Sequence, residues 1–132
     1  MMRQRDLFSS LRRRADFSRV HARGRRKGDG LLQVRVLLRL PARAPLVQTP
    51  LRVGILVGKK YGSAVERNRF KRLVRAALRD LGTTFTPNWD ILILPRQAHE
   101  ASMQDVRNSL RHLLGDLDVL KDDADASQGG ED

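Results

Sequence analysis

The sequence predicts a small two-layer α+β domain, and three observations support this fold class. The chain has 132 residues, which fits one domain with a single hydrophobic core. Apolar residues make up 40% of it, enough for a modest core, whereas aromatic residues make up only 5%. Its apolar residues switch between the spacing of a helix and the alternation of a strand, in the order helix, strand, strand, helix, strand, helix.

The first helix of this outline is short. Asp16 can cap its beginning, and Gly24 can end it in the left-handed conformation. Phe17, Val20 and His21 fall at the helical spacings of three and four residues. One face of this helix is therefore expected to point inward.

Three segments have the composition of β-strands. Residues 31–40 are rich in aliphatic side chains and carry polar residues on alternate positions, namely Gln33, Arg35 and Arg39. Arg35 is therefore expected to face solvent or a ligand. Residues 52–58 and 90–94 are short and apolar enough for a sheet interior, and the proline-marked residues 41–50 predict a loop or hairpin connection.

The strongest helix signal follows residue 63. Ser63 and Glu66 form a capping-box pair, and apolar residues then recur at helical spacing up to Gly82. This apolar stripe comprises Phe70, Leu73, Val74, Ala77, Leu78 and Leu81. A last helix is expected after Ser102, with a buried stripe of Val106, Leu110, Leu113 and Leu114.

The net charge of +11 is unevenly distributed and indicates a polyanionic partner, above all nucleic acid. Residues 1–27 contain ten basic and two acidic residues, and residues 52–79 contain nine and one. Residues 116–132 contain seven acidic residues and one lysine, a composition typical of a disordered tail. We therefore expect a flexible basic N-terminus (1–9), one folded domain (10–115) and an acidic disordered tail (116–132).

The sequence argues against several classes of protein. It contains no cysteine, which excludes disulfides, thiolate nucleophiles and cysteine-based zinc sites. No stretch approaches the length of an apolar membrane span, and the first residues lack the apolar segment of a secretory signal. We therefore expect a cytoplasmic protein that binds no membrane.

The capped helix carries one strongly basic face. The residues opposite its apolar stripe are Asn68, Arg69, Lys71, Arg72, Arg75 and Arg79. Solvated helix faces usually interleave both signs of charge, but Glu66 is the only acidic residue between Arg52 and Arg79. This imbalance favours a polyanion-binding surface over a solvated face. Arg67 lies near the edge of the apolar stripe, where its stem can pack and its guanidinium can reach outward, so a structural role is open.

Polar motifs outside this helix carry less information. Lys59 and Lys60 end the preceding strand beside the helix N-terminus, which favours phosphate contact, with a solvated turn as the alternative. Residues 54–60 are similar to a phosphate-binding P-loop, but they lack its glycine spacing and its Ser or Thr, so no nucleotide site is expected. The three histidines, His21, His99 and His112, do not have the spacing of metal ligands. We expect neither catalytic residues nor a metal site in this chain.

Residues 58–81, GKKYGSAVERNRFKRLVRAALRDL, closely resemble the signature of the protein subunit of bacterial ribonuclease P. The hallmark is the Arg-Asn-Arg run at 67–69, followed by Lys71, Arg72 and Arg75. The resemblance extends upstream to LRRRADFSRV (11–20) with Gly24, and downstream to DILILPR (90–96) and NSLRHLL (108–114). It covers most of the chain, in the same order.

This resemblance implies a subunit of an endoribonuclease in which a small protein joins a large catalytic RNA. The complex hydrolyses precursor tRNA, which releases the 5′ leader, and the RNA holds the Mg²⁺ ions and performs the cleavage. The residues implied for contact with the catalytic RNA are Arg67, Asn68, Arg69, Lys71, Arg72 and Arg75. Those implied for a cleft that holds the single-stranded leader are Phe17, His21, Arg35, Lys59, Lys60 and Arg96. No protein partner is required.

Some positions in the implied cleft leave alternatives open. Phe17 is the candidate for stacking on a base, because a single strand needs a groove with a stacking ring, and filling the core is its equally weighted alternative. His21 and Arg35 stand where the family often has aromatic residues, which puts stacking there in doubt.

The acidic tail also departs from the family, and we hypothesise from its charge that it shields the cleft until RNA displaces it. Deleting residues 116–132 should then tighten nonspecific RNA binding at low salt, and unchanged affinity would count against this hypothesis.

The implied fold is a two-layer α/β sandwich with a small mixed four-stranded sheet, three helices and a ribosomal-protein-like topology. Only three strands are evident from composition, so the fourth is expected to split from residues 31–58. The strand–helix–strand crossover between residues 52 and 94 is implied to be left-handed, against the general rule.

Three other functions compete with a ribonuclease P subunit. A ribosomal or general RNA-binding protein without processing activity is the main alternative, since charge alone would explain it. An autonomous nuclease is disfavoured because no credible set of acid, base and metal ligands is present. A DNA-binding protein that places the basic helix in the major groove is the third, and competition between duplex DNA and structured RNA would test it.

Overall fold

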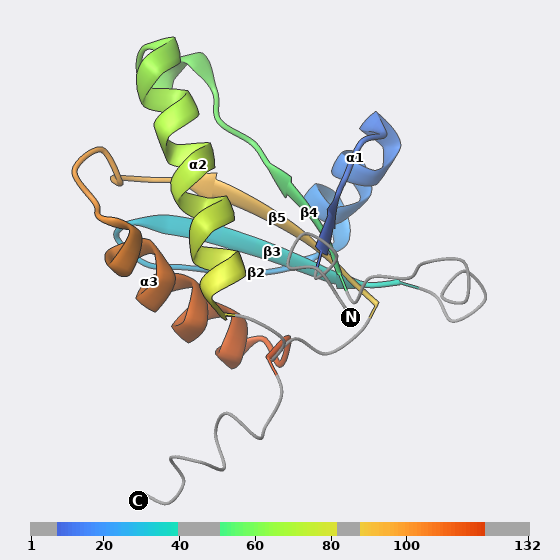
Figure 1. The fold of residues 1–132 in the computed structure, drawn as a ribbon. Coiled ribbons are helices and arrows are strands. Elements are labelled where there is room, and N and C mark those ends of the chain that lie inside the picture. Colours follow the sequence, from blue (N-terminus) through green and yellow to red (C-terminus); the bar gives the residue numbers. More distant parts are fainter. Residues whose placement is uncertain (1–7, 40–50, 82–87, 121–132) are drawn as a thin grey trace, which may run out of the picture.

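The computed structural model describes residues 8–39, 51–81 and 88–120, which form one sheet with helices on both faces (Figure 1). The strands are β1 (Phe8–Ser10), β2 (Arg25–Gly28), β3 (Leu32–Leu38), β4 (Leu51–Ile55) and β5 (Trp89–Pro95). The helices are α1 (Arg14–Arg23), α2 (Ala64–Leu81) and α3 (Met103–Asp116), and a short 3₁₀ turn, η3, spans Lys59–Tyr61. The strand order is β1-β4-β5-β3-β2, with β1, β4 and β5 parallel and the remaining pairs antiparallel.

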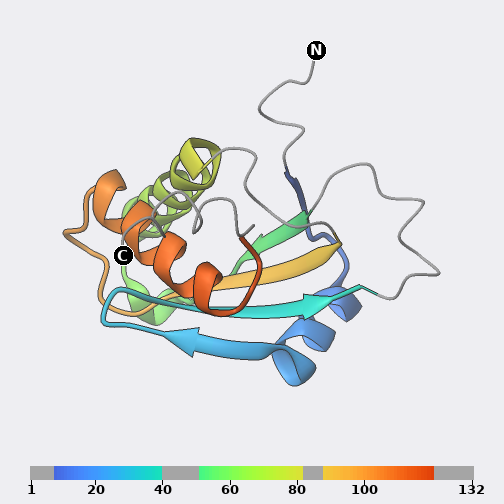
Figure 2. The same ribbon diagram turned by 90° about the horizontal axis from the view of Figure 1, so that it is seen from below.

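The two faces of the sheet carry hydrophobic clusters of different size. Helices α2 and α3 cover one face and α1 lies against the other (Figure 2). The α2/α3 side holds the main core, to which Phe70, Val74 and Leu110 contribute fully buried side chains. The α1 side holds a much smaller cluster of Leu11, Val20 and Leu92, with the half-buried Phe17, Leu37 and Leu94 packed against it. Apolar packing therefore contributes less to the docking of α1 than to that of the other two helices.

The connection from β4 through α2 to β5 joins two neighbouring parallel strands. In Figure 1, α2 lies in front of the sheet, and when both strands are turned to point upward, β5 lies to the left of β4. The crossover is therefore left-handed. This confirms the hand implied by the family resemblance, against the general right-handed preference.

The sheet has five strands instead of the expected four, and the prediction that the missing strand splits from residues 31–58 was wrong. The two strands that composition did not reveal are β1 and β2, which form opposite edges of the sheet. Strand β2 has the sequence RRKG, with three exposed basic side chains and no apolar residue, and pairing with β3 holds it in place. Short, charged edge strands are common in natural sheets because they resist edge-to-edge association. The predicted connection at 41–50 lies outside the described residues.

Two predictions for the ends of α1 were wrong. The N-cap is Arg13, which makes no side-chain cap, whereas Asp16 lies buried in the first turn and binds arginines instead. Gly24 is extended, with φ −69° and ψ 148°, and not left-handed. Glycine is still required there, because a Cβ atom would lie 2.6 Å from the carbonyl oxygen of Val20.

The predictions for α2 and α3 are confirmed. Ser63 N–H donates to Glu66 Oε1 at 2.8 Å, and Glu66 N–H donates to Ser63 Oγ at 3.2 Å, which completes the capping box. Ser102 and Asp105 form the equivalent reciprocal pair at the start of α3. Both expected apolar stripes face the main core.

The described packing extends past both limits of the predicted domain at 10–115. Phe8 and Ser9 belong to β1, which pairs with β4. Leu117, Val119 and Leu120 are buried, so a truncation that tests the acidic tail should begin after Leu120. Residues 1–7 and 121–132, the rest of the two predicted flexible segments, lie outside the described residues. None of the helices in the described segments is long and apolar enough to cross a membrane.

Candidate nucleic-acid interface

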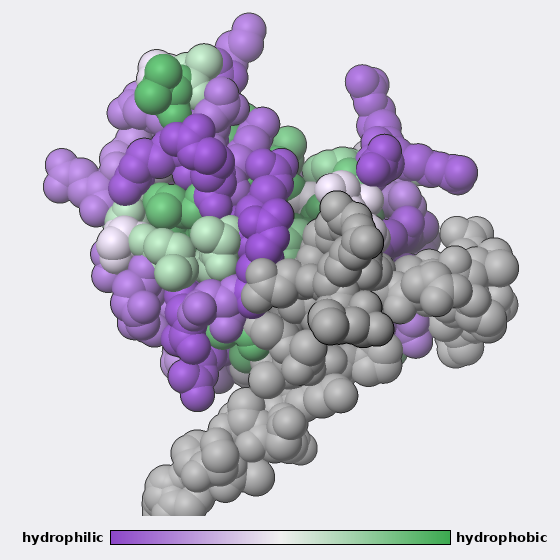
Figure 3. All heavy atoms as spheres, in the orientation of Figure 1, coloured by the Kyte–Doolittle hydropathy of each residue, from purple (hydrophilic) through white to green (hydrophobic). Residues whose placement is uncertain are grey.

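The outer side of α2 presents a row of polar and basic side chains, which we name the α2 face: Asn68, Lys71, Arg72, Arg75 and Arg79. All are exposed except the half-buried Lys71. Figure 3 shows hydrophilic side chains along this side of the helix. Between the described residues, the cations of this face form no ion pair, and the acidic side chains of α2 are engaged elsewhere, Glu66 at the cap and Asp80 with Arg107. The face therefore carries uncompensated positive charge on a rigid element.

Arg69 and Arg67 are held by contacts within the protein. The guanidinium of Arg69 donates to the carbonyl oxygens of His99, at 3.0 Å, and Ala101, at 2.6 Å. It thereby fixes the loop between β5 and α3, a role that its position opposite the apolar stripe did not reveal. Arg67 is half-buried and its Nε donates weakly to the carbonyl of Ser63 at 3.4 Å. A guanidinium has five N–H donors, so both residues retain donors for a ligand.

The turn η3 carries Lys59 and Lys60, both exposed, next to the start of α2. Tyr61 anchors this turn, because its ring stacks on that of His99 with centroids 4.0 Å apart and planes 12° apart. The Nε2 of His99 lies 2.6 Å from the carbonyl oxygen of Tyr61. Since a carbonyl only accepts hydrogen bonds, this nitrogen carries the proton. The two lysines therefore extend from an anchored turn.

A groove of about 510 Å³ runs between α1 and the sheet, and we name it the α1 groove. Its lining is Arg12, Arg14, Phe17, Ser18, His21, Leu56 and Leu92. Leu56 is 44% exposed and adds apolar surface to this lining. An apolar floor, an aromatic ring and a cationic rim are the features of a groove for single-stranded nucleic acid.

Phe17 packs on the sheet and lines the α1 groove at the same time. Its half-buried ring lies against the backbone of β4, where a Cβ atom on Gly54 would lie 2.6 Å from the ring's Cε1 atom and 2.9 Å from Cζ. The absence of a side chain at Gly54 therefore makes room for the ring. The two interpretations of Phe17, stacking residue and core residue, are thus compatible.

The other residues implied for the leader cleft are only partly brought together. His21 lines the α1 groove, and Arg35 lies beside it, because its Nη1 donates to the carbonyl of His21 at 2.6 Å and so satisfies the end of α1. Lys59, Lys60 and Arg96 are not part of the groove lining. Sequence reasoning missed Arg12, Arg14 and Leu56, although the dense basic run before α1 was a signal for the two arginines.

Arg96 directly follows β5 and packs against the turn between β2 and β3. It donates to the carbonyl of Asp29 at 3.0 Å and packs on Gly28, where a Cβ atom would lie 2.9 Å from its Cζ. Burial alone would raise the pKa of Asp29, but hydrogen bonds from Ser109 and from the backbone at 31 and 32 outweigh it, so the pKa lies below its usual value. This turn is therefore anchored to α3, and Arg96 packs against it.

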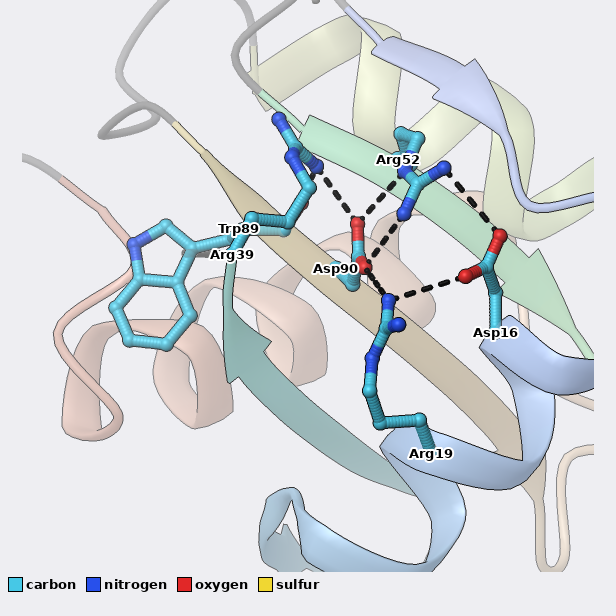
Figure 4. Close-up of polar contacts among 6 residues, drawn as sticks. All are labelled: Asp16, Arg19, Arg39, Arg52, Trp89 and Asp90. Carbon is cyan, nitrogen blue, oxygen red and sulfur yellow. Dashed lines mark hydrogen bonds and ion pairs between the residues drawn. The ribbon is translucent and has the colours of Figure 1, made fainter. Parts of the chain in front are cut away.

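A buried ionic cluster, shown in Figure 4, attaches α1 to the sheet. Its centre is Asp90, at the start of β5, whose side chain is fully buried. Arg52 binds both carboxylate oxygens, at 2.9 and 2.8 Å, Arg39 binds Oδ1 at 2.6 Å, and Arg19 binds Oδ2 at 3.2 Å. Burial alone would raise the pKa of Asp90, but its hydrogen bonds from Arg52 and Arg39 and their positive charges hold it below the usual value.

Asp16 joins this cluster from α1. Its carboxylate lies 3.0 Å from Arg19 and 3.4 Å from Arg52. Because Asp16 and Arg19 are both on α1, the helix that carries Phe17 and His21 is fixed to β4 and β5 by ion pairs as well as by its small apolar cluster. The ionic cluster therefore helps to hold α1, one wall of the α1 groove, against the sheet.

Comparison with known proteins identifies the family. The family model for Ribonuclease P matches residues 7–118. The chain belongs to the ribonuclease P protein family. The ribonuclease P protein component of Dehalococcoides mccartyi is 38% identical over 111 residues, which cover 83% of this chain and 85% of that protein. The ribonuclease P protein component of Herpetosiphon aurantiacus is 38% identical over 119 residues, which cover 89% and 91%.

Solved structures of ribonuclease P proteins have the same fold. The protein from Staphylococcus aureus has a TM-score of 0.71 at 26% identity, covering 85% of this chain and 97% of that one. The protein from Thermotoga maritima has a TM-score of 0.66 at 26% identity, covering 79% and 93%. Family membership confirms the resemblance and supports a ribonuclease P subunit over a general RNA-binding protein. The chain thus has a role in an endoribonuclease complex for tRNA processing and associates with ribonuclease P RNA.

Proposed function

We propose that this protein bridges two RNAs, with the α2 face on the catalytic RNA and the α1 groove on the 5′ leader of precursor tRNA. The observation that carries the proposal is the separation of two unlike surfaces on one small fold. One is a row of cations on a helix, none of which forms an ion pair with a described residue, and the other is a groove with an apolar floor and an aromatic ring.

The α2 face suits folded RNA. A-form helices present regularly spaced phosphates and a shape that a rigid basic helix can follow. Arg67, Asn68, Arg72 and their neighbours can donate to those phosphates without first breaking an ion pair inside the protein. Arg69 contributes with its remaining donors and by holding the loop after β5.

The α1 groove suits a single strand. Phe17 offers a ring for stacking on a base, His21 offers a smaller one, and Arg12 and Arg14 can contact the phosphates on either side. Because β4 and β5 run parallel, the segments that follow them emerge at the same end of the sheet. These segments carry Lys59, Lys60 and Arg96. A leader that leaves the groove past Leu56 would meet these cations. Arg35 positions the end of α1.

Hydrolysis is assigned to the RNA and its Mg²⁺ ions, which would supply the nucleophile and stabilise the departing oxygen. In the segments that the structure describes, no group of three or more His, Asp or Glu side chains could hold a metal ion. Asp16 and Asp90 are engaged by arginines, and the field of the protein is positive. The chain's own residues therefore bind and orient the two RNAs, and we propose that they do so in the cytoplasm.

The test compares precursor tRNA with mature tRNA. The protein is assembled with a bacterial ribonuclease P RNA, and the affinity of the complex for each tRNA is measured in Ca²⁺, which supports folding but slows cleavage. The proposal predicts tighter binding of the precursor, and a Phe17→Ala variant that loses this preference while it assembles normally. Equal affinity for the two tRNAs in the wild-type complex would refute the leader-binding role.

A further inference from the structure

A second cavity lies at the edge of the sheet, between α1 and α2, and has a volume of about 140 Å³. Its lining comes from β1, the start of α1, β4 and α2: Phe8, Ser10, Leu11, Phe17, Val53, Gly54, Ile55, Lys71 and Arg75. A cavity of this size holds several water molecules or one phosphate group. It is too small for a nucleobase with its ribose.

The floor of this cavity is an unpaired stretch of strand. Strand β1 pairs with β4 only as far as Ser10 opposite Val53, and the N–H of Leu11 makes the final hydrogen bond, to the carbonyl of Val53 at 2.9 Å. Backbone groups along a strand point alternately to its two sides, so the N–H and C=O of Ile55 point to the same side as those of Val53. Beyond the end of β1, this side of β4 therefore faces the cavity, and it offers the N–H of Ile55 as a donor.

The wall on the α2 side is cationic. Lys71 and Arg75 lie one helical turn apart and both line the cavity. Neither forms a hydrogen bond or an ion pair with any residue that the structure describes. Ser10 adds a hydroxyl on the opposite side. Two cations without a partner among the described residues, a hydroxyl and a backbone N–H are groups that bind anions.

The remaining wall is Phe17, which lines this cavity and the α1 groove alike. We propose that the cavity binds one phosphate of the single-stranded leader, next to the base that stacks on Phe17. This inference refines the role of the α2 face: it assigns two of its members, Lys71 and Arg75, to the leader and leaves Asn68, Arg72 and Arg79 for the catalytic RNA. This inference rests on the proposed function of the α1 groove.

The shape of the cavity favours a single strand over a folded RNA. Walls from α1 and α2 enclose it on two sides, so the phosphate must enter with little bulk around it. A duplex presents its phosphates on a wide, stiff surface, whereas a single strand can turn one phosphate inward. The neighbouring aromatic ring adds a stacking interaction that a base-paired strand could not use.

The test measures binding of a short single-stranded oligouridylate to the free protein over a range of salt concentrations. Removing the protein's hold on one phosphate should lower the log–log salt slope by about 0.7. We expect the Lys71→Ala/Arg75→Ala variant to lower the slope by about this amount and to bind several-fold more weakly. Arg111→Ala is the matched control, because it removes an exposed arginine of α3 from a site that lines neither hollow, and we expect it to bind as wild type.

A second readout does not depend on the folding of a variant. In the wild-type protein, the amide NMR signals of Gly54 and Ile55 should shift when the oligouridylate is added. An unchanged salt slope in the double variant, together with unchanged amide signals, overturns the inference, even if the complex still prefers precursor tRNA over mature tRNA. If the wild-type complex binds precursor tRNA and mature tRNA equally well, the proposed function is refuted instead. The two failures are therefore distinguishable.

Discussion

Asp90→Asn is the substitution that most directly tests what holds α1 in place. Asparagine has nearly the same shape as aspartate but no charge, so the change leaves Arg19, Arg39 and Arg52 around a neutral amide. The side chain of Arg39 is only 4% exposed, and its Nε and Nη2 atoms already lack partners within the described residues. Among the described residues, Asp90 is the only carboxylate that pairs with Arg39, since Asp16 contacts Arg19 and Arg52 instead.

The size of the effect follows from burial. Removing one partner of a buried ion pair costs about 3–5 kcal/mol. Arg19 and Arg52 are 31% and 24% exposed, so water screens part of their charge and the lower end of that range applies. The whole domain is expected to be stable by about 5–15 kcal/mol, so a loss of about 3 kcal/mol is a large fraction of it.

The assay is urea unfolding followed by circular dichroism, which gives the free energy of unfolding. Asp80→Asn is the matched control, because its ion pair with Arg107 is partly exposed and should contribute less than about 1 kcal/mol. A loss below about 1 kcal/mol in Asp90→Asn would refute the reasoning. It would mean that water or a rearrangement compensates the three arginines.

Three further predictions concern pH, the groove and α2. The pKa of Asp90 is depressed in the folded state, so the carboxylate stabilises the protein above the unfolded pKa of about 3.9. This stability is lost as the pH falls through the folded pKa, and Asp90→Asn should flatten the decline when unfolding is measured from pH 6 to pH 3. Gly54→Ala should displace the ring of Phe17 and weaken oligouridylate binding by about 1–3 kcal/mol, the value of one stacked base. The control is Gly30→Ala, which adds a methyl group in open space and should leave binding unchanged. Equal binding by the two variants would contradict the argument that Gly54 makes room for the ring. Arg72→Ala should weaken binding to the catalytic RNA and lower its salt slope without changing stability, whereas Arg69→Ala should lower the unfolding temperature; the reverse pattern would contradict their assigned contacts.

The helices were predictable because their signals are local. Ser63 and Glu66 lie three residues apart, and the apolar stripe of α2 repeats every three or four residues, so a short window contains the whole pattern. The same holds for α3 with Ser102 and Asp105. The family motif at 67–69 is also contiguous, which made the resemblance visible from the sequence.

The features that sequence reasoning missed depend on residues far apart in the chain. Strand β2 is basic and without apolar alternation, and only its partner β3 makes it a strand. Asp90 looked like the first residue of an apolar strand, yet it binds arginines that are 38, 51 and 71 positions away. Arg69 was assigned to an outward face, but a loop 30 residues away takes two of its donors. A helical wheel contains no information about such partners.

The central claim is that the protein assists ribonuclease P by holding both RNAs, and cleavage at low Mg²⁺ tests it most directly. A 5′-extended precursor tRNA is incubated with a bacterial ribonuclease P RNA, with and without this protein, and the products are mapped. The account predicts faster cleavage at the mature 5′ end, with a smaller stimulation for a precursor whose leader is a single nucleotide. No stimulation with a cognate RNA, or equal stimulation for both leaders, would contradict it.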